Sequence, residues 1–367
     1  MNEQWHRYFR HYASALFPRF ASEKHWNYKD DLCMLGCDML LCTTGEAVYR
    51  DAIVACGRAL ADENGVLTCW NPAEHNLDTI SFGKSLLVLH RTTGSDAYLR
   101  AAMNVWRQLE THPRVSSGNY WHKDIYPHQV WLDGLYMALP FSARCMELSG
   151  EEDYASILAQ FESVRRRLWV EDKRLYIHAW DESRASEWAD PATGRSPCFW
   201  LRAMGWYLMA LADCYEVISR RADASALKAL LEEAVDGLLP YQDAQSRMFL
   251  QLIDRADLPD NYPETSGSAM VAYALLKGAR LHMLPGSAAG TGAEIMEGIR
   301  TRYLSEGDSA PVLRGICASA GLGPGPDHRT DRDGSPAYYL SERQIPDNQH
   351  GSAACMMACA ELLRAGL

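Results

Sequence analysis

The sequence lacks a lysine- and arginine-rich stripe, a long apolar run and a repeated pair of cysteines. Its 367 residues carry a formal net charge of −11, which argues against a nucleic-acid partner because phosphate recognition depends on clustered cations. No apolar segment is long enough to cross a bilayer. The N-terminus has scattered charges in place of the apolar core of a signal peptide. We therefore expect a cytoplasmic protein that binds neither nucleic acid nor a membrane.

The eleven cysteines are dispersed and odd in number. Cys33, Cys37 and Cys42 lie nearest to one another in the chain, and three thiols could in principle hold a metal ion. Their segment, DLCMLGCDMLLCTTG, has the apolar pattern of a buried helix, in which cysteine packs as a small hydrophobic residue. We expect no disulfide, metal or organic cofactor.

The alternation typical of strands is rare, whereas apolar residues recur at three- and four-residue spacing along most of the chain. This pattern predicts an all-α protein. Residues 83–102 and 134–158 form a weak repeat, in which a glycine precedes a very apolar helix, a turn follows at Gly94 or Gly150, and a more polar helix comes next. Each repeat therefore reads as a helical hairpin.

Apolar helices that start at a glycine recur along the chain, at Gly83, Gly134, Gly205, Gly267 and Gly351. A helix that is apolar on every face must be buried all round, so we expect these helices inside and the amphipathic helices outside, in a toroid. We find no linker and expect a single domain over residues 1–367. The stretch 284–294 is rich in glycine and alanine and is expected to be a loop within one hairpin.

In such a ring the inner helices begin at the same rim, so the residues around their glycines converge. Asp133, in VWLDG, is one of these. It could simply interact with the helix N-terminus, or it could be a general acid whose pKa is raised by the apolar flanks Trp131 and Leu132. Asp78 holds the equivalent position in the preceding hairpin, with the same two interpretations. Two carboxylates across a pocket are typical of enzymes that act on sugars.

Other polar and aromatic residues fall near the same rim. Arg202 lies between Trp200 and Trp206, which suits it to bind a carboxylate, although a salt bridge would also explain it. Aromatic side chains stack on sugar rings, and Tyr28, next to Trp26, is a further candidate wall. Four histidines fall near rim segments, of which we expect one or two to be functional: His122, His128, His178 and His350. Glu264 is as consistent with a helix cap as with a site residue.

Five segments in this order resemble glycoside hydrolase family 105, the unsaturated rhamnogalacturonyl hydrolases, and more distantly the unsaturated glucuronyl hydrolases of family 88. They are NLDTISFGKSLLVLHRTTG, WHKDIYPHQVWLDGLYMALPF, SPCFWLRAMGWYLMAL, YPETSGSAMVAYALLKG and RDGSPAYYLSERQIPDNQHGSAACMMACAEL.

The resemblance implies an (α/α)6 double ring of six helical hairpins that acts on the terminal 4,5-unsaturated uronic acid left on pectin fragments by polysaccharide lyases. It implies that Asp133 protonates carbon 4 of the vinyl ether and then activates water for addition at carbon 5, so that the hemiketal opens and releases the remaining chain. Asp78 matches the second acid of the family. The residues that match sugar-contacting positions are His122, His178, Trp200, Arg202 and Trp206, and Tyr28 matches less closely.

The sequence leaves several alternatives open. An epimerase on a similar ring would use histidines as acid and base, for instance His178 and His350. A non-catalytic toroid could bind oligosaccharide, and an inverting glycosidase could use Asp78 and Asp133 on saturated sugars. Bulky Leu201 and Met204 stand where many relatives have smaller or polar residues, which leaves the exact sugar open. The chain could be a monomer or a homodimer.

Overall fold

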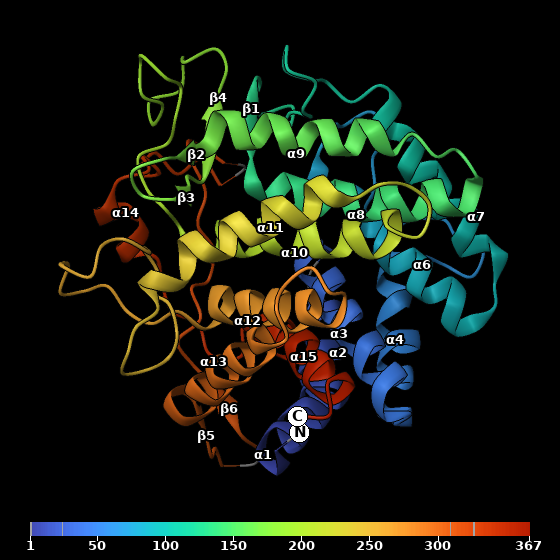
Figure 1. Ribbon diagram of the computed structural model, residues 1–367. Helices are drawn as coiled ribbons and strands as arrows, with labels where there is room; N and C mark the ends of the chain where they lie inside the picture. The colour runs from blue at the N-terminus through green and yellow to red at the C-terminus, as the bar shows by residue number, and fades with distance from the viewer. Residues whose placement is uncertain (1, 24, 309, 326) are drawn as a thin grey trace.

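The computed structural model describes residues 2–23, 25–308, 310–325 and 327–367, and its helices form two concentric rings (Figure 1). The expected all-α (α/α)6 architecture is confirmed. The inner helices of the described chain are α3 (Tyr28–Thr44), α6 (Phe82–Thr93), α8 (Leu132–Ser149), α10 (Leu201–Ile218), α12 (Thr265–Arg280) and α15 (Gln349–Arg364). The outer ring consists of α4 (Ala47–Leu60), α7 (Asp96–Arg107), α9 (Tyr154–Leu168), α11 (Ser225–Leu238), α13 (Ser287–Tyr303) and the N-terminal segment α1 (Glu3–His11), η1 (Tyr12–Leu16) and α2 (Phe17–Glu23).

The inner helices close into a ring in chain order, with α15 returning to α3 and with α6 joined to α8 by the hydrogen bond from Lys84 to the carbonyl of Tyr136. Two glycines allow close approach. A Cβ at Gly83 of α6 would lie 2.0 Å from the Phe141 ring of α8, and one at Gly205 of α10 would lie 2.7 Å from Met270 of α12. The glycines at the starts of these apolar helices thus have a packing role.

The N-terminal segment completes the outer ring between α4 and α13. Its η1 and α2 pack on α4, and Gln4 accepts a hydrogen bond from Arg300 of α13 at 3.1 Å. Tyr8 is hydrogen-bonded to Ser352 of α15 at 2.7 Å. The two ends of the chain therefore lie close together (Figure 1).

The connections differ at the two ends of the barrel. Where α3, α6 and α8 end, the chain turns directly into the next outer helix at Gly45, Gly94 and Gly150, each with a positive φ between 72° and 79°, which glycine adopts at little cost. At the opposite end, the longer connections 61–81, 108–131, 169–200, 239–264 and 304–348 lead back to the inner helices. They contain the short elements α5 (Leu77–Ile80), η2 (Gln108–Glu110), η3 (Leu239–Tyr241), α14 (Pro336–Ser341), β1 (Gln129–Trp131), β2 (Trp169–Val170), β3 (Leu175–Tyr176), β4 (Ala179–Asp181), β5 (Leu304–Ser305) and β6 (Val312–Leu313).

These long connections are tied to the starts of the inner helices in a repeating way. The first backbone N–H of α8, at Leu132, donates to the carbonyl of His178 at 3.1 Å, one residue before β4 pairs antiparallel with β1. The same bond joins the start of one element to the following connection at three other places: Leu77 to His122 at 3.0 Å, Leu201 to Gln251 at 3.1 Å, and Thr265 to Gly315 at 2.8 Å. Each bond satisfies a helix N–H that has no partner within its own helix.

The expectation of a loop over 284–294 is wrong, because α13 begins at Ser287. Its glycines and alanines show no apolar period, but they let α13 lie close to α12: a Cβ at Gly292 would be 2.8 Å from Leu276. Packing rather than local propensity therefore determines this helix.

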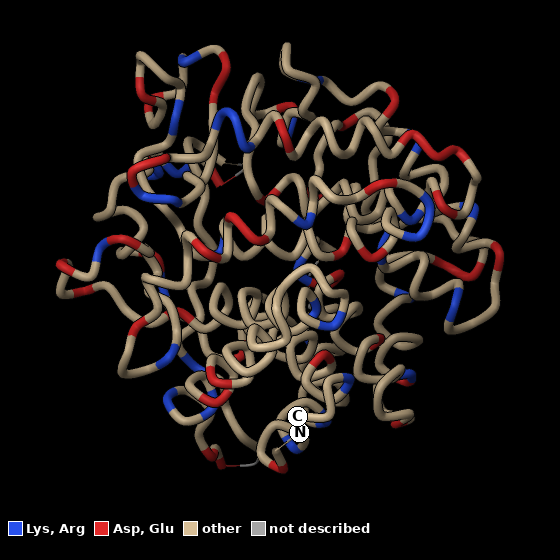
Figure 2. Tube along the Cα trace, viewed as in Figure 1, with Lys and Arg blue, Asp and Glu red and all other residues tan. Residues whose placement is uncertain are grey.

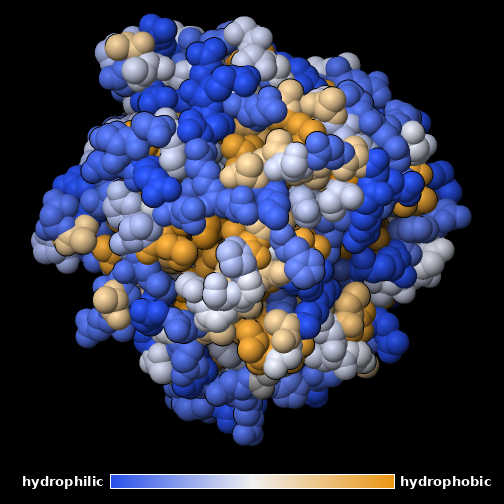
Figure 3. Space-filling view, viewed as in Figure 1, coloured by the Kyte–Doolittle hydropathy of each residue, from blue (hydrophilic) through white to orange (hydrophobic). Residues whose placement is uncertain are grey.

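Figure 2 shows acidic and basic residues interspersed along the trace, and Figure 3 shows a mainly hydrophilic face with hydrophobic patches between outer helices. Among the described residues, no helix combines the length and apolar character needed to cross a membrane.

Candidate active site

The predicted charged site residues occupy equivalent positions at one mouth of the barrel. Asp133, Arg202 and His350 are each the second residue of an inner helix, α8, α10 and α15, and Asp78 is the second residue of the short α5 that precedes α6. Tyr28 is the first residue of α3. Since the inner helices run side by side, this shared position brings the five residues to the same rim.

A cavity of about 300 Å³ opens at this mouth. Four of the nine predicted residues line it: Tyr28, Asp78, His122 and Asp133. A second hollow of about 580 Å³ adjoins it and shares Tyr28, Asp78 and Ser319 with it. The other five predicted residues, His178, Trp200, Arg202, Trp206 and His350, are not among the residues that line either hollow.

Asp133 faces His178, and the two form the core of the site. Its Oδ2 lies 3.1 Å from His178 Nε2, and the imidazole is fully buried. The residue before α8 is Trp131, and among the described residues no side chain caps this helix. The other imidazole nitrogen, Nδ1, is 2.6 Å from Tyr339 Oη. A series of polar contacts thus runs from the cavity into the core: Asp133 and His178 are close but not hydrogen-bonded to each other, and His178 is hydrogen-bonded to Tyr339.

The expectation that apolar surroundings raise the pKa of Asp133 is wrong for the unliganded protein. Burial raises the pKa, but the nearby imidazole of His178, with a smaller contribution from His122, outweighs burial and holds the pKa below its usual value. The sequence shows the apolar neighbours of Asp133, Trp131 and Leu132, but not His178, which reaches the carboxylate through the β1–β4 pairing.

Asp78 has a different partner. Its Oδ2 lies 2.6 Å from Lys123 Nζ, and Asn76 rather than Asp78 caps α5. Burial lowers the pKa of Lys123, but the charge of Asp78 outweighs burial and raises it above its usual value. His122 Nε2 is 3.9 Å from Asp78 Oδ1, and burial lowers the pKa of His122 to about 4. The described lining of the cavity therefore combines three acidic residues, Asp78, Asp133 and Asp327, with Lys123, Arg332 and the imidazole of His122.

Three aromatic and imidazole rings form one wall. Tyr28 Oη and His350 Nε2 are 3.0 Å apart, and the Trp206 ring lies edge-on to both, with centroids 6.4 Å away. Tyr136 packs beneath Trp206 at 4.9 Å and closes the bore. Burial lowers the pKa of His350 well below its usual value, so this wall is uncharged.

Arg202 is almost fully buried and lies over the Trp200 ring, with its Cζ 4.8 Å from the ring centroid. Its Nη1 donates to Cys317 O at 2.7 Å and to Ser266 Oγ at 3.1 Å. The rest of the guanidinium makes no hydrogen bond with any other residue that the structure describes. Trp200 packs on His178 with centroids 4.8 Å apart, which connects the arginine to the acid.

Three further candidates, Glu264, Trp26 and His128, have other contacts. Glu264 is the N-cap of α12, accepts bonds from the backbone N–H groups of Ser266 and Gly267, and is fully buried, so it has a capping role. Trp26 is buried and donates to Asp31 at 2.9 Å. His128 lies beside Trp121 with centroids 4.6 Å apart and does not line the cavity.

The sequence interpretation missed several residues of this mouth. Lys123, Tyr126 and Arg332 line the cavity, and Gln251 holds the backbone position equivalent to His122 and His178. Lys123 directly follows His122, a signal that was present in the sequence. The others depend on how the long connections fold.

Cys33, Cys37 and Cys42 lie on α3 as expected, the first two buried and the third exposed. Within the described chain no group of three or more histidine, cysteine or acidic residues is arranged to hold a metal ion.

Comparisons with known proteins agree with this arrangement. The model of Glycosyl Hydrolase Family 88 matches residues 1–366. A family 105 glycoside hydrolase of C. acetobutylicum is 37% identical, with 97% of this chain and 99% of that chain covered and a TM-score of 0.90. The unsaturated glucuronyl hydrolase of Bacillus sp. GL1, responsible for the degradation of glycosaminoglycan, shares the fold at 15% identity, with 98% and 96% of the chains covered and a TM-score of 0.70. The unsaturated rhamnogalacturonyl hydrolase YesR of Bacillus subtilis is 30% identical over 215 residues, 56% of this chain and 59% of YesR.

Proposed function

Because the chain belongs to Glycosyl Hydrolase Family 88, we propose that it removes the terminal 4,5-unsaturated galacturonic acid from lyase-generated rhamnogalacturonan oligosaccharides. The observation that carries the proposal is the Asp133–His178 pair in a cavity that also holds Asp78. The similarity to YesR supports the choice of substrate. No cofactor is needed for this reaction.

In the proposed reaction, Asp133 in its protonated form gives H⁺ to carbon 4 of the ring alkene. The carboxylate that remains then takes a proton from water as the water oxygen adds to carbon 5. The resulting hemiketal opens, and the bond to the rest of the oligosaccharide breaks. Asp133 is thus the general acid and then the general base.

In this proposal Asp133 becomes protonated only when the substrate binds, because His178 lowers the pKa of this carboxyl in the free protein. The uronic acid brings a second carboxylate and displaces water. A nearby like charge and loss of solvent both favour the protonated acid. We assign the substrate carboxylate to Arg202, because its guanidinium has N–H groups left over after the bonds to Cys317 and Ser266 and could bind a carboxylate in a bidentate manner.

Asp78, paired with Lys123, is the proposed source of negative charge where the ring becomes cationic. Tyr28 lines the cavity and offers aromatic surface to the sugar, and the buried Trp206 ring packs edge-on against it. We propose that the nine predicted residues act together in this way and that residues 1–367 form one catalytic domain.

A second candidate is an unsaturated glucuronyl hydrolase that acts on another lyase-cleaved polysaccharide. It is favoured by solved structures with this fold that bear that name, one of them specific for heparin. The proposal extends to any terminal unsaturated uronic acid, because the groups assigned to Asp133 and Arg202, the ring alkene and the carboxylate, are common to all of them.

The test uses rhamnogalacturonan and heparin oligosaccharides, each treated with the matching lyase, and follows the ultraviolet absorbance of the conjugated double bond. We expect decay with the rhamnogalacturonan fragments and a loss of about 10²–10⁴-fold in rate for Asp133→Asn. Asp51→Asn, whose side chain is 74% exposed on α4, is the matched control and should keep full activity.

Equal rates for Asp133→Asn and the control would refute the role of Asp133, and decay with only the heparin fragments would favour the second candidate. Turnover of saturated sugars would indicate an inverting glycosidase. An epimerase would lose activity with His178 and His350 replaced but keep much of it in Asp133→Asn.

A further inference from the structure

The opposite end of the barrel contains a second cavity, of about 280 Å³. Every inner helix contributes to it, mostly from its C-terminal half, so it lies at the far end of the bore from Asp133. Among the described residues its charged lining has three carboxylates and more cations, namely Lys84, Arg91, Arg144, Arg220, Lys277 and Arg364. This balance is unusual in a chain of net charge −11.

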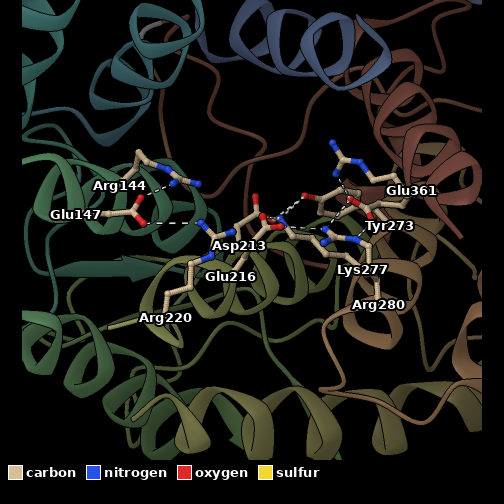
Figure 4. Close-up of polar contacts among 10 residues, drawn as sticks. Arg144, Glu147, Asp213, Glu216, Arg220, Tyr273, Lys277, Arg280 and Glu361 are labelled. Carbon is tan, nitrogen blue, oxygen red and sulfur yellow. Dashed lines mark hydrogen bonds and ion pairs between the residues drawn. The ribbon is translucent and has the colours of Figure 1, made fainter. Parts of the chain in front are cut away.

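The ion pairs around the cavity leave positive charge over. Lys277 Nζ lies 2.7 Å from both Asp213 and Glu216, which neutralises it fully. Arg144 and Arg220, in contrast, share one acid, Glu147 (Figure 4).

On the C-terminal side of the cavity the charges are balanced. Arg280 and Arg364 both pair with the single fully buried Glu361, and Arg280 also reaches Glu216 at 3.1 Å (Figure 4). The excess of positive charge therefore lies with Arg144 and Arg220, which share one acid.

Lys84 and Arg91 are two further cations in the lining of this cavity. Lys84 is buried and donates a hydrogen bond to a neutral group, the carbonyl of Tyr136 at 3.1 Å, with Nζ 3.9 Å from the Tyr136 ring. Arg91 pairs with Asp38, yet burial and the like charges of Arg144 and Arg364 lower its pKa below the usual value. The guanidinium groups therefore repel one another across the cavity, and an anion between them would relieve this repulsion.

We infer that this cavity is a binding site for a small organic anion with a phosphate or carboxylate group, held between Arg144 and Arg220. Guanidinium groups bind both of these anions in a bidentate manner. The size is at the lower limit of small-molecule sites, which span about 300–1,000 Å³, so an oligosaccharide does not fit. Leu87, Phe141 and Met357 add apolar lining, which suits a ligand with a short carbon skeleton.

The experiment measures the Tm of the whole protein against increasing inorganic phosphate and, separately, citrate, with sodium chloride adjusted to constant ionic strength. We expect a saturable rise in Tm with at least one probe, since a ligand that binds only the folded state stabilises it. A lower half-saturation concentration for phosphate would identify a phosphorylated ligand, and one for citrate a carboxylic acid.

Three variants locate the binding. Arg144→Gln/Arg220→Gln should weaken it at least tenfold by calorimetry, and it should fold because these side chains are 38% and 53% exposed. Arg58→Gln/Arg107→Gln removes the same charge from exposed positions on α4 and α7 and should bind as the wild type does. Asp133→Asn should also bind normally, which separates this result from the proposed activity.

Saturation by neither probe would overturn the inference. So would equal binding by the two arginine double variants, since it would place the anion elsewhere. If Arg144→Gln/Arg220→Gln does not fold, Arg220→Gln alone gives the same comparison.

Discussion

Replacing Lys277 by methionine should destabilise the protein strongly. Lys277 is 6% exposed and its Nζ lies 2.7 Å from Asp213, 2.7 Å from Glu216 and 3.1 Å from Tyr273 Oη. Methionine fills the space of the aliphatic chain but leaves both carboxylates without this cation. Removal of one member of a buried ion pair costs about 3–5 kcal/mol, because the remaining charge stays away from water.

This free energy corresponds to a measurable change in Tm. An unfolding entropy of about 2.1 cal/mol/K per residue over 367 residues gives about 0.8 kcal/mol/K. The loss should therefore lower Tm by about 4–6 °C in calorimetry at neutral pH. Lys173→Met is the matched control, because Lys173 is 42% exposed and pairs with Asp254 at 3.0 Å. Exposed pairs contribute about 0–1 kcal/mol, so its Tm should fall by about 1 °C or less.

A second variant tests the cause. Lys277→Met/Asp213→Asn removes one of the two stranded charges, while Glu216 keeps Arg280 at 3.1 Å, so it should recover part of the lost Tm. Equal losses for Lys277→Met and Lys173→Met, or no recovery in the double variant, would refute the argument that burial makes this pair important.

The remaining predictions concern packing, acid stability and the pH profile. Gly83→Ala places a methyl group 2.0 Å from an aromatic ring of α8 and should lower the free energy of unfolding in urea by about 1–3 kcal/mol. The control Gly290→Ala, with nothing within 4 Å of its Cβ, should be neutral or stabilise by up to about 1 kcal/mol. Equal effects would contradict the packing argument. Burial raises the pKa of Glu216, but its two cations outweigh burial and lower the pKa from 4.5 to about 2. Glu216 therefore contributes about 3 kcal/mol of stability above pH 4.5, which is lost as the pH falls through 2. The stability of Glu216→Gln should fall less steeply below pH 5 than that of the wild type, and an unchanged slope would refute this. His178→Gln should raise the pKa of Asp133 and move the alkaline limb of kcat/KM for the proposed reaction to higher pH; an unmoved limb would show that His178 does not control this acid.

The sequence was sufficient to predict the ring because the signals for an inner helix are local. An apolar helix that follows a glycine, and ends at a turn such as Gly94 or Gly150, is readable in about 25 residues, and these turns have the positive φ that glycine permits. The start of α13 was missed for the opposite reason. Its small residues have no apolar period, and Gly292 matters only because α12 lies against it.

The site was predictable to the extent that it follows from helix starts. Asp78 and Asp133 were paired through the repeat, and the structure places them at equivalent positions on one cavity. Lys123, Arg332 and Gln251 were missed because they lie on long connections, whose paths are determined by hydrogen bonds to distant helix starts. Periodicity carries no information about such bonds.

The pKa of Asp133 depends on both its sequence neighbours and a contact that only the fold creates. Its sequence neighbours argue for desolvation, which raises the pKa, and burial does act in that direction. A carboxylate in a dry cavity, however, responds most to the nearest charged or polar partner, and His178 is 3.1 Å away. The same reasoning requires the substrate to raise the pKa of Asp133. Burial alone does not outweigh His178, but the carboxylate of a bound substrate and the loss of water both favour the protonated acid. An acid that is charged while the site is open and protonated once it is filled would hold its proton only when there is an alkene to receive it.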